Sequence, residues 1–237
     1  MSNDKYLAHH TTLRTKRKLV LKWLNVNDAL EAKVLDFLRV NFHPNEPLNR
    51  SIDLMSFPQD VTTLDVLYKN CFPHGASVVA LDENGNLVGV LLNDILKRNA
   101  DEHTETEGED PNWNPTPRYA KFLDLIPQIA KDMRLFEKYP KVDAILDHAI
   151  LSVGDGWQGD GISQILVDYA NSVIAKKFNC GLSFVICSSY FSARVFEKCG
   201  YKEIWSKKFR DYQENGNILF PTESPHDNIT CKLLELN

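Results

Sequence analysis

The sequence predicts an α/β protein in which about seven strands form one mixed central sheet with helices set among them. Short runs rich in β-branched and aromatic residues alternate with segments whose apolar residues recur at helical spacing. The dipeptide Asn84-Gly85 lies between two such runs and marks a tight antiparallel hairpin. Between Ile145 and Tyr201 the order is strand, glycine-rich loop, helix and strand, which is the order of a βαβ unit. We expect this unit to organise the chain.

The first half of the chain supplies three predicted strands and two predicted helices. The strands are residues 18–26, 77–81 and 87–93. The first helix begins at Ala29, and the second covers residues 60–71. Asn27 and Asp28 are both residue types that cap helices. The segment Asn45 to Asn49 reads as a turn between the two helices.

The second half begins with an acidic, proline-containing stretch, residues 99–117, which we predict to be a long loop. This loop is either a solvated insertion or a guide for cationic ligands. The helical pattern over residues 118–139 contains Pro127, which predicts a kink or a break there. The remaining predicted strands are residues 145–153, 182–187, 201–205 and 228–236, and the remaining helices are residues 164–177 and 192–198.

Composition fits one globular domain and narrows the range of partners. The 237 residues are 43% hydrophobic with a net charge of −5, so the chain offers no overall basic field for nucleic acid. We expect residues 1–17 to be a polar arm and residues 18–237 to be a single domain. Neither a secretory signal nor a membrane-spanning run is recognisable, so we expect no membrane partner.

The five cysteines show neither the paired spacing of a zinc site nor a disulfide framework. We interpret them as reduced thiols of a cytoplasmic protein that needs no metal. Their positions are Cys71, Cys180, Cys187, Cys199 and Cys231. The oligomeric state stays open, and a monomer is compatible with the sequence.

The glycine-rich loop predicts a phosphate site. Unpaired N–H groups gather at the start of its helix, where the helix dipole also favours an anion. The segment Gly154 to Gly159 matches G-x-G-x-x-G, a pattern typical of dinucleotide sites. Such a site expects a carboxylate after the next strand, but that strand ends Ile186-Cys187-Ser188-Ser189. The missing acid argues against a nicotinamide dinucleotide.

The overlapping frame Gln158 to Ser163 resembles the Q/R-x-x-G-x-G/A signature of the GNAT superfamily of acetyl-CoA-dependent N-acetyltransferases. Three further segments resemble the insect-type arylalkylamine N-acetyltransferases: Glu46-Pro47-Leu48-Asn49, residues 188–194 and residues 197–201. The resemblance extends over most of the chain. It implies the GNAT (acyl-CoA N-acyltransferase) fold, a mixed and mostly antiparallel central sheet flanked by helices. It also implies transfer of an acetyl group from acetyl-CoA to a small-molecule amine.

The resemblance implies a binding site for coenzyme A at the loop and at the strand before it. That strand would separate from the next one and offer free backbone groups to the pantetheine arm like an added strand. The glycines would let the pyrophosphate approach the main chain, and Gln158 could add a donor. The implied cofactor-binding residues are Leu151, Ser152, Val153, Gln158, Gly159, Asp160, Gly161, Ile162 and Ser163.

Two residues of the loop depart from the family pattern. Ser163 stands where Gly or Ala is preferred, and its small side chain should still fit. Asp160 places a carboxylate in a loop meant for phosphate. If the carboxylate points outward to water, nothing is lost, and if it points inward, it weakens coenzyme A binding. We expect the outward direction. If Asp160 pointed inward, Asp155 nearby would add to the repulsion.

The predicted catalytic residues are Glu46, Ser188 and Ser192. An alkylamine with a pKa of about 10.4 is protonated at neutral pH, so the reaction needs a base. Glu46 matches the base proposed for the insect enzymes, and its alternative role is that of a solvated turn residue. One of the two serines could protonate the leaving thiolate while the other caps a helix. Tyr190 and Cys187 are alternatives for the acid, and His148 is interpreted as a hydrogen-bonded core residue.

Three hypotheses for function follow from these residues. The first is an acetyl-CoA-dependent N-acetyltransferase that acts on small arylalkylamines by direct attack in a ternary complex. The second is a protein or polyamine acetyltransferase on the same fold, which an acidic loop would favour. The third is a non-catalytic module that binds acyl-CoA, a possibility raised by Asp160 and Ser163. The particular amine and the acyl chain length are not encoded in any motif that we recognise.

Overall fold

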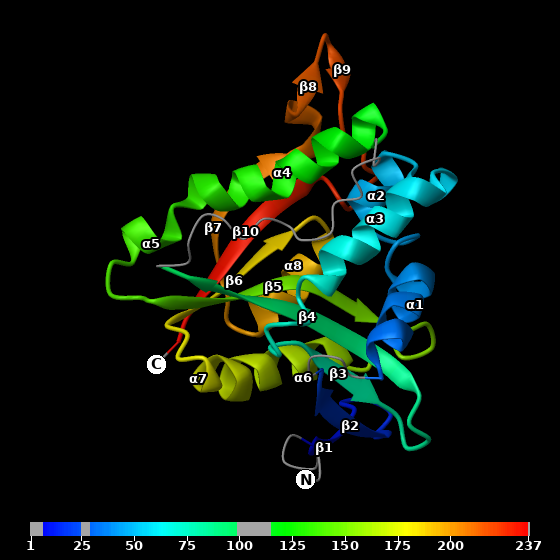
Figure 1. Cartoon of the computed structure of the whole chain (residues 1–237), viewed down its shortest axis with the longest axis vertical. Helices are drawn as coiled ribbons and strands as arrows, with labels where there is room; N and C mark the ends of the chain where they lie inside the picture. Colours follow the sequence, from blue (N-terminus) through cyan, green and yellow to red (C-terminus); the bar gives the residue numbers. More distant parts are fainter. Residues whose placement is uncertain (1–6, 25–28, 99–114, 237) are drawn as a thin grey trace.

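The computed structural model describes residues 7–24, 29–98 and 115–236. Its centre is an eight-stranded sheet with the order β1-β2-β3-β4-β5-β6-β10-β7. All neighbouring strands are antiparallel except β5 and β6, which are parallel. The strands are β1 (Leu7–Thr11), β2 (Lys18–Trp23), β3 (Val78–Leu81), β4 (Leu87–Lys97), β5 (Ala144–Val153), β6 (Leu182–Cys187), β7 (Lys202–Lys208) and β10 (Asn228–Glu235). The mixed, mostly antiparallel sheet is therefore confirmed (Figure 1).

The seven strands predicted from the sequence are all present, and the eighth is β1. Its residues were expected in a polar arm, but they pair with β2 from Leu7 to Thr11. The sequence His9-His10-Thr11 lacks an apolar alternation, so only pairing with a neighbouring strand makes it β structure. The predicted cap at Asn27-Asp28 lies outside the described residues, as do residues 99–114 of the predicted acidic loop.

Helices cover both faces of the sheet (Figure 1). One face carries α6 (Ile162–Tyr169), a π-helical turn (Ala170–Ile174), α7 (Ala175–Lys177) and α8 (Tyr190–Lys198). The other face carries α1 (Glu31–Asn41), α2 (Pro47–Ser51), α3 (Pro58–Lys69), α4 (Pro117–Met133) and α5 (Leu135–Lys138). The first layer packs on sheet residues such as Leu146, and the second on Ile145 and Ile150. Side chains of β5 therefore pack into the helical layers on both faces of the sheet.

Three local features differ from the expectation. The segment after Asn45 is not a simple turn, because Pro47–Ser51 forms α2 with Glu46 as its N-cap. Helix α4 continues through Pro127, where a kink or a break was expected, and ends at Met133. Its C-cap is Arg134, whose φ of 46° is left-handed. Between the strands predicted at residues 201–205 and 228–236, the chain also forms a small hairpin of β8 (Gln213–Glu214) and β9 (Asn217–Ile218).

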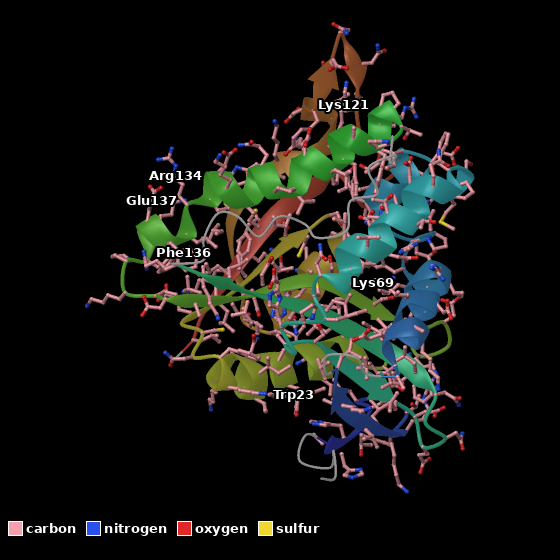
Figure 2. The ribbon with its side chains drawn as sticks, viewed as in Figure 1. Trp23, Lys69, Lys121, Arg134, Phe136 and Glu137 are labelled. Atoms are coloured by element: carbon pink, nitrogen blue, oxygen red, sulfur yellow. The ribbon has the colours of Figure 1, made fainter. Side chains whose placement is uncertain are left out.

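Trp23 and Lys121, both labelled in Figure 2, make contacts that join distant parts of the chain. Trp23 of β2 donates a hydrogen bond from Nε1 to the hydroxyl of Tyr169, at the end of α6, over 2.9 Å. Lys121 on α4 forms an ion pair with Glu214 in the β8–β9 hairpin. Over the described ranges, no helix has the length and apolar character needed to cross a membrane.

Candidate active site

The parallel strands β5 and β6 pair over only part of their length. Their register runs from Ile145 opposite Leu182 to His148 opposite Val185. Beyond that point β5 continues to Val153 beside β4, and β6 continues beside β10. The two strands therefore separate after His148 and leave one edge of β5 without a sheet partner. The separation expected for Leu151, Ser152 and Val153 is thus present in the structure.

The glycine loop opens directly onto the N-terminus of α6. None of the main-chain N–H groups of residues 158–164 donates a hydrogen bond within the described part of the chain. A Cβ added at Gly159, whose φ is +70°, would meet nothing within 4 Å. Free donors, open space and the helix dipole are what a pyrophosphate requires. The residues present therefore fit the phosphate end of coenzyme A.

Asp160 points toward the turn between β1 and β2, and its side chain is 0% exposed. The main-chain N–H groups of Arg14 and Thr15 donate to its Oδ1 over 2.9 and 2.8 Å. The guanidinium of Arg17 donates to Oδ2 over 3.0 Å, and the Thr15 hydroxyl also contacts this oxygen. The expectation that Asp160 reaches water is wrong, because protein donors take the place of water. The guanidinium of Arg17 offsets the negative charge of Asp160, so this carboxylate does not by itself repel a phosphate.

These donors determine the charge of Asp160. Removal from water by itself would raise the pKa of the carboxyl, but hydrogen bonds from Thr15 and Arg17 outweigh that effect. The pKa of Asp160 therefore lies well below its usual range, and the group is ionised at neutral pH. The turn of residues 12–17, which we call the bracing turn, thus holds a permanent ion pair against the loop.

The bracing turn makes three more contacts with the loop. The N–H of Leu13 donates to the carbonyl of Asp160 over 2.9 Å. Arg17 lies over the ring of Trp157 at 3.5 Å and donates to the carbonyl of Gly156 over 3.1 Å. A Cβ at Gly161 would lie 2.4 Å from Leu13, and its φ is +83°. The glycine at 161 therefore serves the contact with Leu13 and the left-handed backbone, whereas Gly159 is the glycine that leaves space for a ligand.

The other predicted cofactor residues take different positions. The Gln158 amide donates to Asp155 over 3.2 Å, which holds both side chains within the loop. Ile162 is 1% exposed and packs into the core beside Gly89, so only its N–H group is available to a ligand. Ser163 is partly exposed in the first turn of α6. Ile162 can therefore offer a ligand only its main chain, whereas the side chain of Ser163 is partly accessible.

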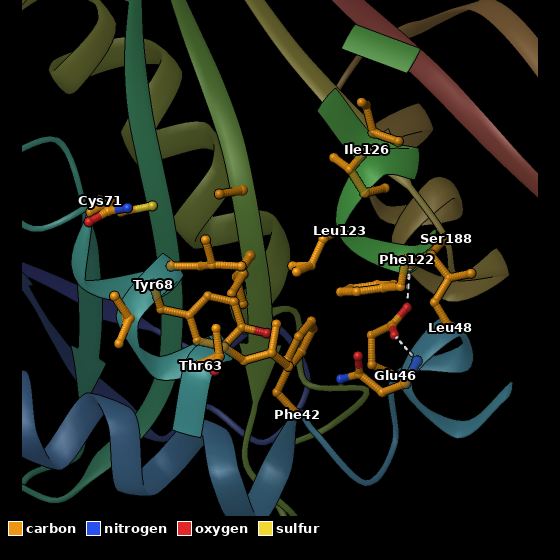
Figure 3. A pocket seen from close by; sticks show the side chains of 18 of the residues that line it. Phe42, Glu46, Leu48, Thr63, Tyr68, Cys71, Phe122, Leu123, Ile126 and Ser188 are labelled. Atoms are coloured by element: carbon orange, nitrogen blue, oxygen red, sulfur yellow. Dashed lines mark hydrogen bonds between the residues drawn. The ribbon is translucent and has the colours of Figure 1, made fainter. Parts of the chain in front are cut away.

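A cavity of about 820 Å³ lies on the face covered by α2, α3 and α4 (Figure 3). Its wall contains His148, Ala149 and Ile150 of β5 together with Ile186 and Ser188, so it reaches the place where β5 and β6 separate. Most of the remaining wall is apolar or aromatic. It includes Phe42, Leu48, Tyr68, Phe122, Leu123 and Ile126. A volume of this size holds a drug-sized molecule.

Glu46 and Ser188 meet at the wall of this cavity (Figure 3). The Ser188 hydroxyl donates to Oε1 of Glu46 over 2.6 Å, and the N–H of Asn49 donates to Oε2 over 2.6 Å. Glu46 is 7% exposed, so it is not a solvated turn residue. Burial raises the pKa of Glu46, and hydrogen bonds from Ser188, Asn49 and Leu48 oppose that effect only in part. Its place at the N-cap of α2 fixes its direction.

The structure does not bring Ser192 to the cavity wall. Its hydroxyl donates to the carbonyl of Ser189 over 2.9 Å on α8. The cap of α8 is Ser189, which accepts from the N–H of Phe191, so neither Ser188 nor Ser192 has the capping role expected for one of them. Tyr190 is 46% exposed at the start of the same helix. Burial raises the pKa of Cys187 to about 12, which makes its thiol a weak acid.

His148 is a hydrogen-bonded core residue, as expected. Its Nδ1 lies 2.6 Å from Oδ1 of Asn93, and its Nε2 lies 2.7 Å from the hydroxyl of Tyr201 and 2.9 Å from that of Ser183. Burial lowers the pKa of His148 to about 3, so the ring is neutral. This network runs from β4 through β5 to Ser183 of β6 and to Tyr201, which lies between α8 and β7. It stabilises the point at which β5 and β6 begin to separate.

Asp147 is a cavity-lining carboxylate that the sequence reasoning missed. It is the only carboxylate between Ala144 and Val153, in a strand that is mostly apolar. A carboxylate in such a run departs from the pattern of a buried strand, and that departure was the available signal. Over residues 7–24, 29–98 and 115–236, no group of three or more His, Cys, Asp or Glu residues is arranged to hold a metal ion.

Solved structures with a similar fold include several N-acetyltransferases. Arylalkylamine N-acetyltransferase 2 from Aedes aegypti is 24% identical over 92% of this chain and 99% of that chain, with a TM-score of 0.79. The polyamine N-acetyltransferase of Drosophila melanogaster, which forms N-acetylagmatine, is 19% identical over 92% of this chain and 100% of that chain, with a TM-score of 0.73. No protein-family model matches the chain. At these identities the likeness shows the fold alone. The chain has the GNAT fold, and its structure resembles those of insect arylalkylamine N-acetyltransferases.

Proposed function

We propose that this protein transfers an acetyl group from acetyl-CoA to the primary amine of a small arylalkylamine. The observation that carries the proposal is the position of the open edge of β5. This edge lies between the glycine loop, which fits a pyrophosphate, and the cavity, which fits a drug-sized molecule. A pantetheine arm added along Leu151 to Val153 would join the two sites. The names of the solved structures with this fold support the same reaction.

The chain's own residues have distinct tasks in this proposal. The N–H groups of residues 158–164 bind the pyrophosphate, and the bracing turn fixes the loop through Asp160. Apolar and aromatic side chains such as Phe42 and Phe122 enclose the aryl group and exclude water. Glu46 acts as general base, and the Ser188 hydroxyl bonded to it carries a proton toward the leaving sulfur. Ser192 stays a predicted relay residue without a contact to either group.

Glu46 is suited to proton transfer by its environment. Burial raises its pKa toward neutrality, so the carboxylate binds a proton more readily than an exposed one. Acetyl-CoA, when bound, supplies a thioester that is open to direct attack by an amine, so the chain needs no nucleophile of its own. The five free thiols fit a reducing compartment, and we propose the cytoplasm as the location.

The test is a panel of amines with purified protein and acetyl-CoA, in which release of free coenzyme A thiol is followed. We expect amine-dependent release with phenethylamine, tyramine, dopamine and tryptamine. Absence of release from any amine, with coenzyme A still bound tightly in calorimetry, would instead identify a non-catalytic acyl-CoA-binding module.

A polyamine acetyltransferase is the second candidate, and Asp147 is the observation that favours it. A second carboxylate on the cavity wall can bind the distant cationic group of a diamine or of agmatine. The same panel therefore includes spermine, putrescine and agmatine. Higher kcat/KM for these amines than for phenethylamine would support the second candidate over the first.

A further inference from the structure

We propose that Asp147 is a catalytic residue that removes the first proton from the charged amine, while Glu46 and Ser188 handle the second proton. The inference rests on the acetyl transfer proposed above and assigns a role to a residue that no motif contains. Asp147 stands on β5 directly opposite Asp94 of β4 and beside Phe184 of β6. It is one of two carboxylates, with Glu46, on the described wall of the cavity.

Asp147 lies on the cavity side of β5, next to a bulge at the place where the acyl group would lie. The register of β4 and β5 shifts between Leu92, opposite Ile150, and Asn93, opposite His148, so Ala149 is an extra residue. Ala149 is exposed to the cavity, and Asp147 is the next side chain on the same side of β5. Bulges redirect side chains at the edges of sites.

The direction of β5 determines which end of a bound pantetheine arm would lie at the glycine loop and which at the cavity. An arm that begins at the glycine loop and follows β5 backward from Val153 runs toward Ala149, where β5 no longer pairs with β6. Its thioester end therefore comes to lie near Ala149. Asp147 is two residues farther along the strand, about 7 Å at 3.3 Å per residue, which is within reach of an amine at the thioester.

The Asp147 carboxyl has no hydrogen bond or ion pair with any part of the described chain. Burial, with a smaller contribution from Asp94, raises the pKa of Asp147 to about 7. Asp94 is itself bound by His74, with 2.6 Å between Oδ1 and Nδ1. The buried thiols of Cys71 and Cys231 also face Asp147, and both are neutral because burial raises their pKa values. No cation of the described chain satisfies Asp147, which leaves it available to a substrate ammonium.

The proton balance of the reaction requires two acceptors in sequence. An ammonium first loses one proton to Asp147 and becomes a neutral amine. When the nitrogen–carbon bond forms and the carbon–sulfur bond breaks, the nitrogen loses a second proton, which passes through Glu46 and Ser188 to the sulfur. The products are an amide and a thiol, and Asp147 returns its proton to water. A group with a pKa near the working pH can both accept and release that proton.

The test compares Asp147→Asn with Asp143→Asn, a matched change at an exposed Asp just before β5. Two substrates are used: phenethylamine, which is protonated at neutral pH, and its β,β-difluoro analogue, whose fluorines lower the amine pKa. For Asp147→Asn we expect kcat/KM to fall about 100-fold with phenethylamine and to stay within about threefold with the difluoro analogue. Raising the pH should restore the phenethylamine rate, and Asp143→Asn should match the wild type throughout.

A second readout needs no acetyl-CoA. In protein labelled with carboxyl-¹³C aspartate, one signal should titrate at about pH 7 and be missing from Asp147→Asn. N,N-dimethylphenethylamine is cationic but cannot form the neutral amide product, and its binding should move this titration to lower pH. Asp94→Asn, which keeps Asp147, should also move it lower because a neighbouring negative charge is removed.

Three results would overturn the assignment. One is an equal loss of rate for both amines, and another is the absence of an aspartate signal that titrates near neutrality. The third is a wild-type pH profile for Asp147→Asn when the wild-type protein acetylates phenethylamine, which would leave the proposed function intact. A wild-type protein that acetylates no amine would overturn both the function and the role of Asp147.

Discussion

Asp160 and Glu46 are both buried carboxylates, but their pKa values move in opposite directions. Asp160 receives two main-chain N–H groups, a hydroxyl and the guanidinium of Arg17. Glu46 receives the hydroxyl of Ser188 and main-chain N–H groups of Asn49 and Leu48 beside an apolar cavity, and no cation from the described residues is among its donors. The difference teaches that the donors around a carboxylate, rather than its burial, decide whether it serves as a fixed charge or as a proton acceptor.

The largest effect should come from Glu46→Gln. The amide keeps an oxygen that can cap α2 but cannot accept a proton, so we expect kcat to fall about 100- to 1,000-fold. The loss should persist with β,β-difluorophenethylamine, because Glu46 takes the second proton rather than the first. Steady-state kinetics with both amines measures this, and Glu83→Gln, at a 63% exposed side chain, is the control. A wild-type kcat in Glu46→Gln would show that Glu46 is not the general base.

A smaller effect is expected at the serines. Ser188→Ala removes the hydroxyl that donates to Glu46, which should raise the pKa of Glu46 further and lower kcat about tenfold. Ser192→Ala loses the bond to the carbonyl of Ser189 and a contact with the thiol of Cys187, neither of which involves Glu46, so kcat should stay within about twofold. The pair of variants is compared in one kinetic series over pH. A loss in Ser192→Ala as large as that in Ser188→Ala would restore Ser192 as a relay residue.

Asp160→Asn tests the other half of the comparison. The amide cannot hold Arg17 as an ion pair, so the bracing turn should loosen and KM for acetyl-CoA should rise about fivefold with kcat unchanged. The control is Asp155→Asn, in the same loop but exposed. The sign of the change is decisive, because a carboxylate that repels phosphate would give a lower KM when it is neutralised.

The smallest effect should appear in stability as a function of pH. Asp160 has a lowered folded pKa, so its contribution is full above the unfolded pKa of about 3.9 and is lost as the pH falls through the folded value. Asp147 has a folded pKa of about 7, so its ionisation destabilises the fold progressively from about pH 4 to pH 7. Asp147→Asn should therefore gain about 1 kcal/mol in free energy of unfolding at pH 8 and little at pH 4.

Urea unfolding at the two pH values measures the difference between wild type and Asp147→Asn. An equal change at both values would show that Asp147 is ionised throughout, as Asp160 is. Asp147 would then resemble the fixed charge of Asp160 and could not act as a proton acceptor beside Glu46.

Much of the fold was predictable because its signals are local. The Asn84-Gly85 turn and the glycine loop of the βαβ unit depend on residues adjacent in sequence. Strand β1 was not predictable, since its polar residues become a strand only beside β2. The end of α4 at Met133, before the left-handed Arg134, was likewise not predicted, because the helical spacing of apolar residues continues to Phe136.

The sequence by itself determined the glycine loop, the seven strands expected around it and the candidate base Glu46, because each follows from short-range pattern or resemblance. Only the tertiary structure decided the charge environment of each carboxylate. Residues 15 and 160 are 145 positions apart, and residues 46 and 188 are 142 apart. Donors at such separations are assembled by the fold, so the permanent charge of Asp160 and the raised pKa values of Glu46 and Asp147 could not be derived from neighbours in the chain.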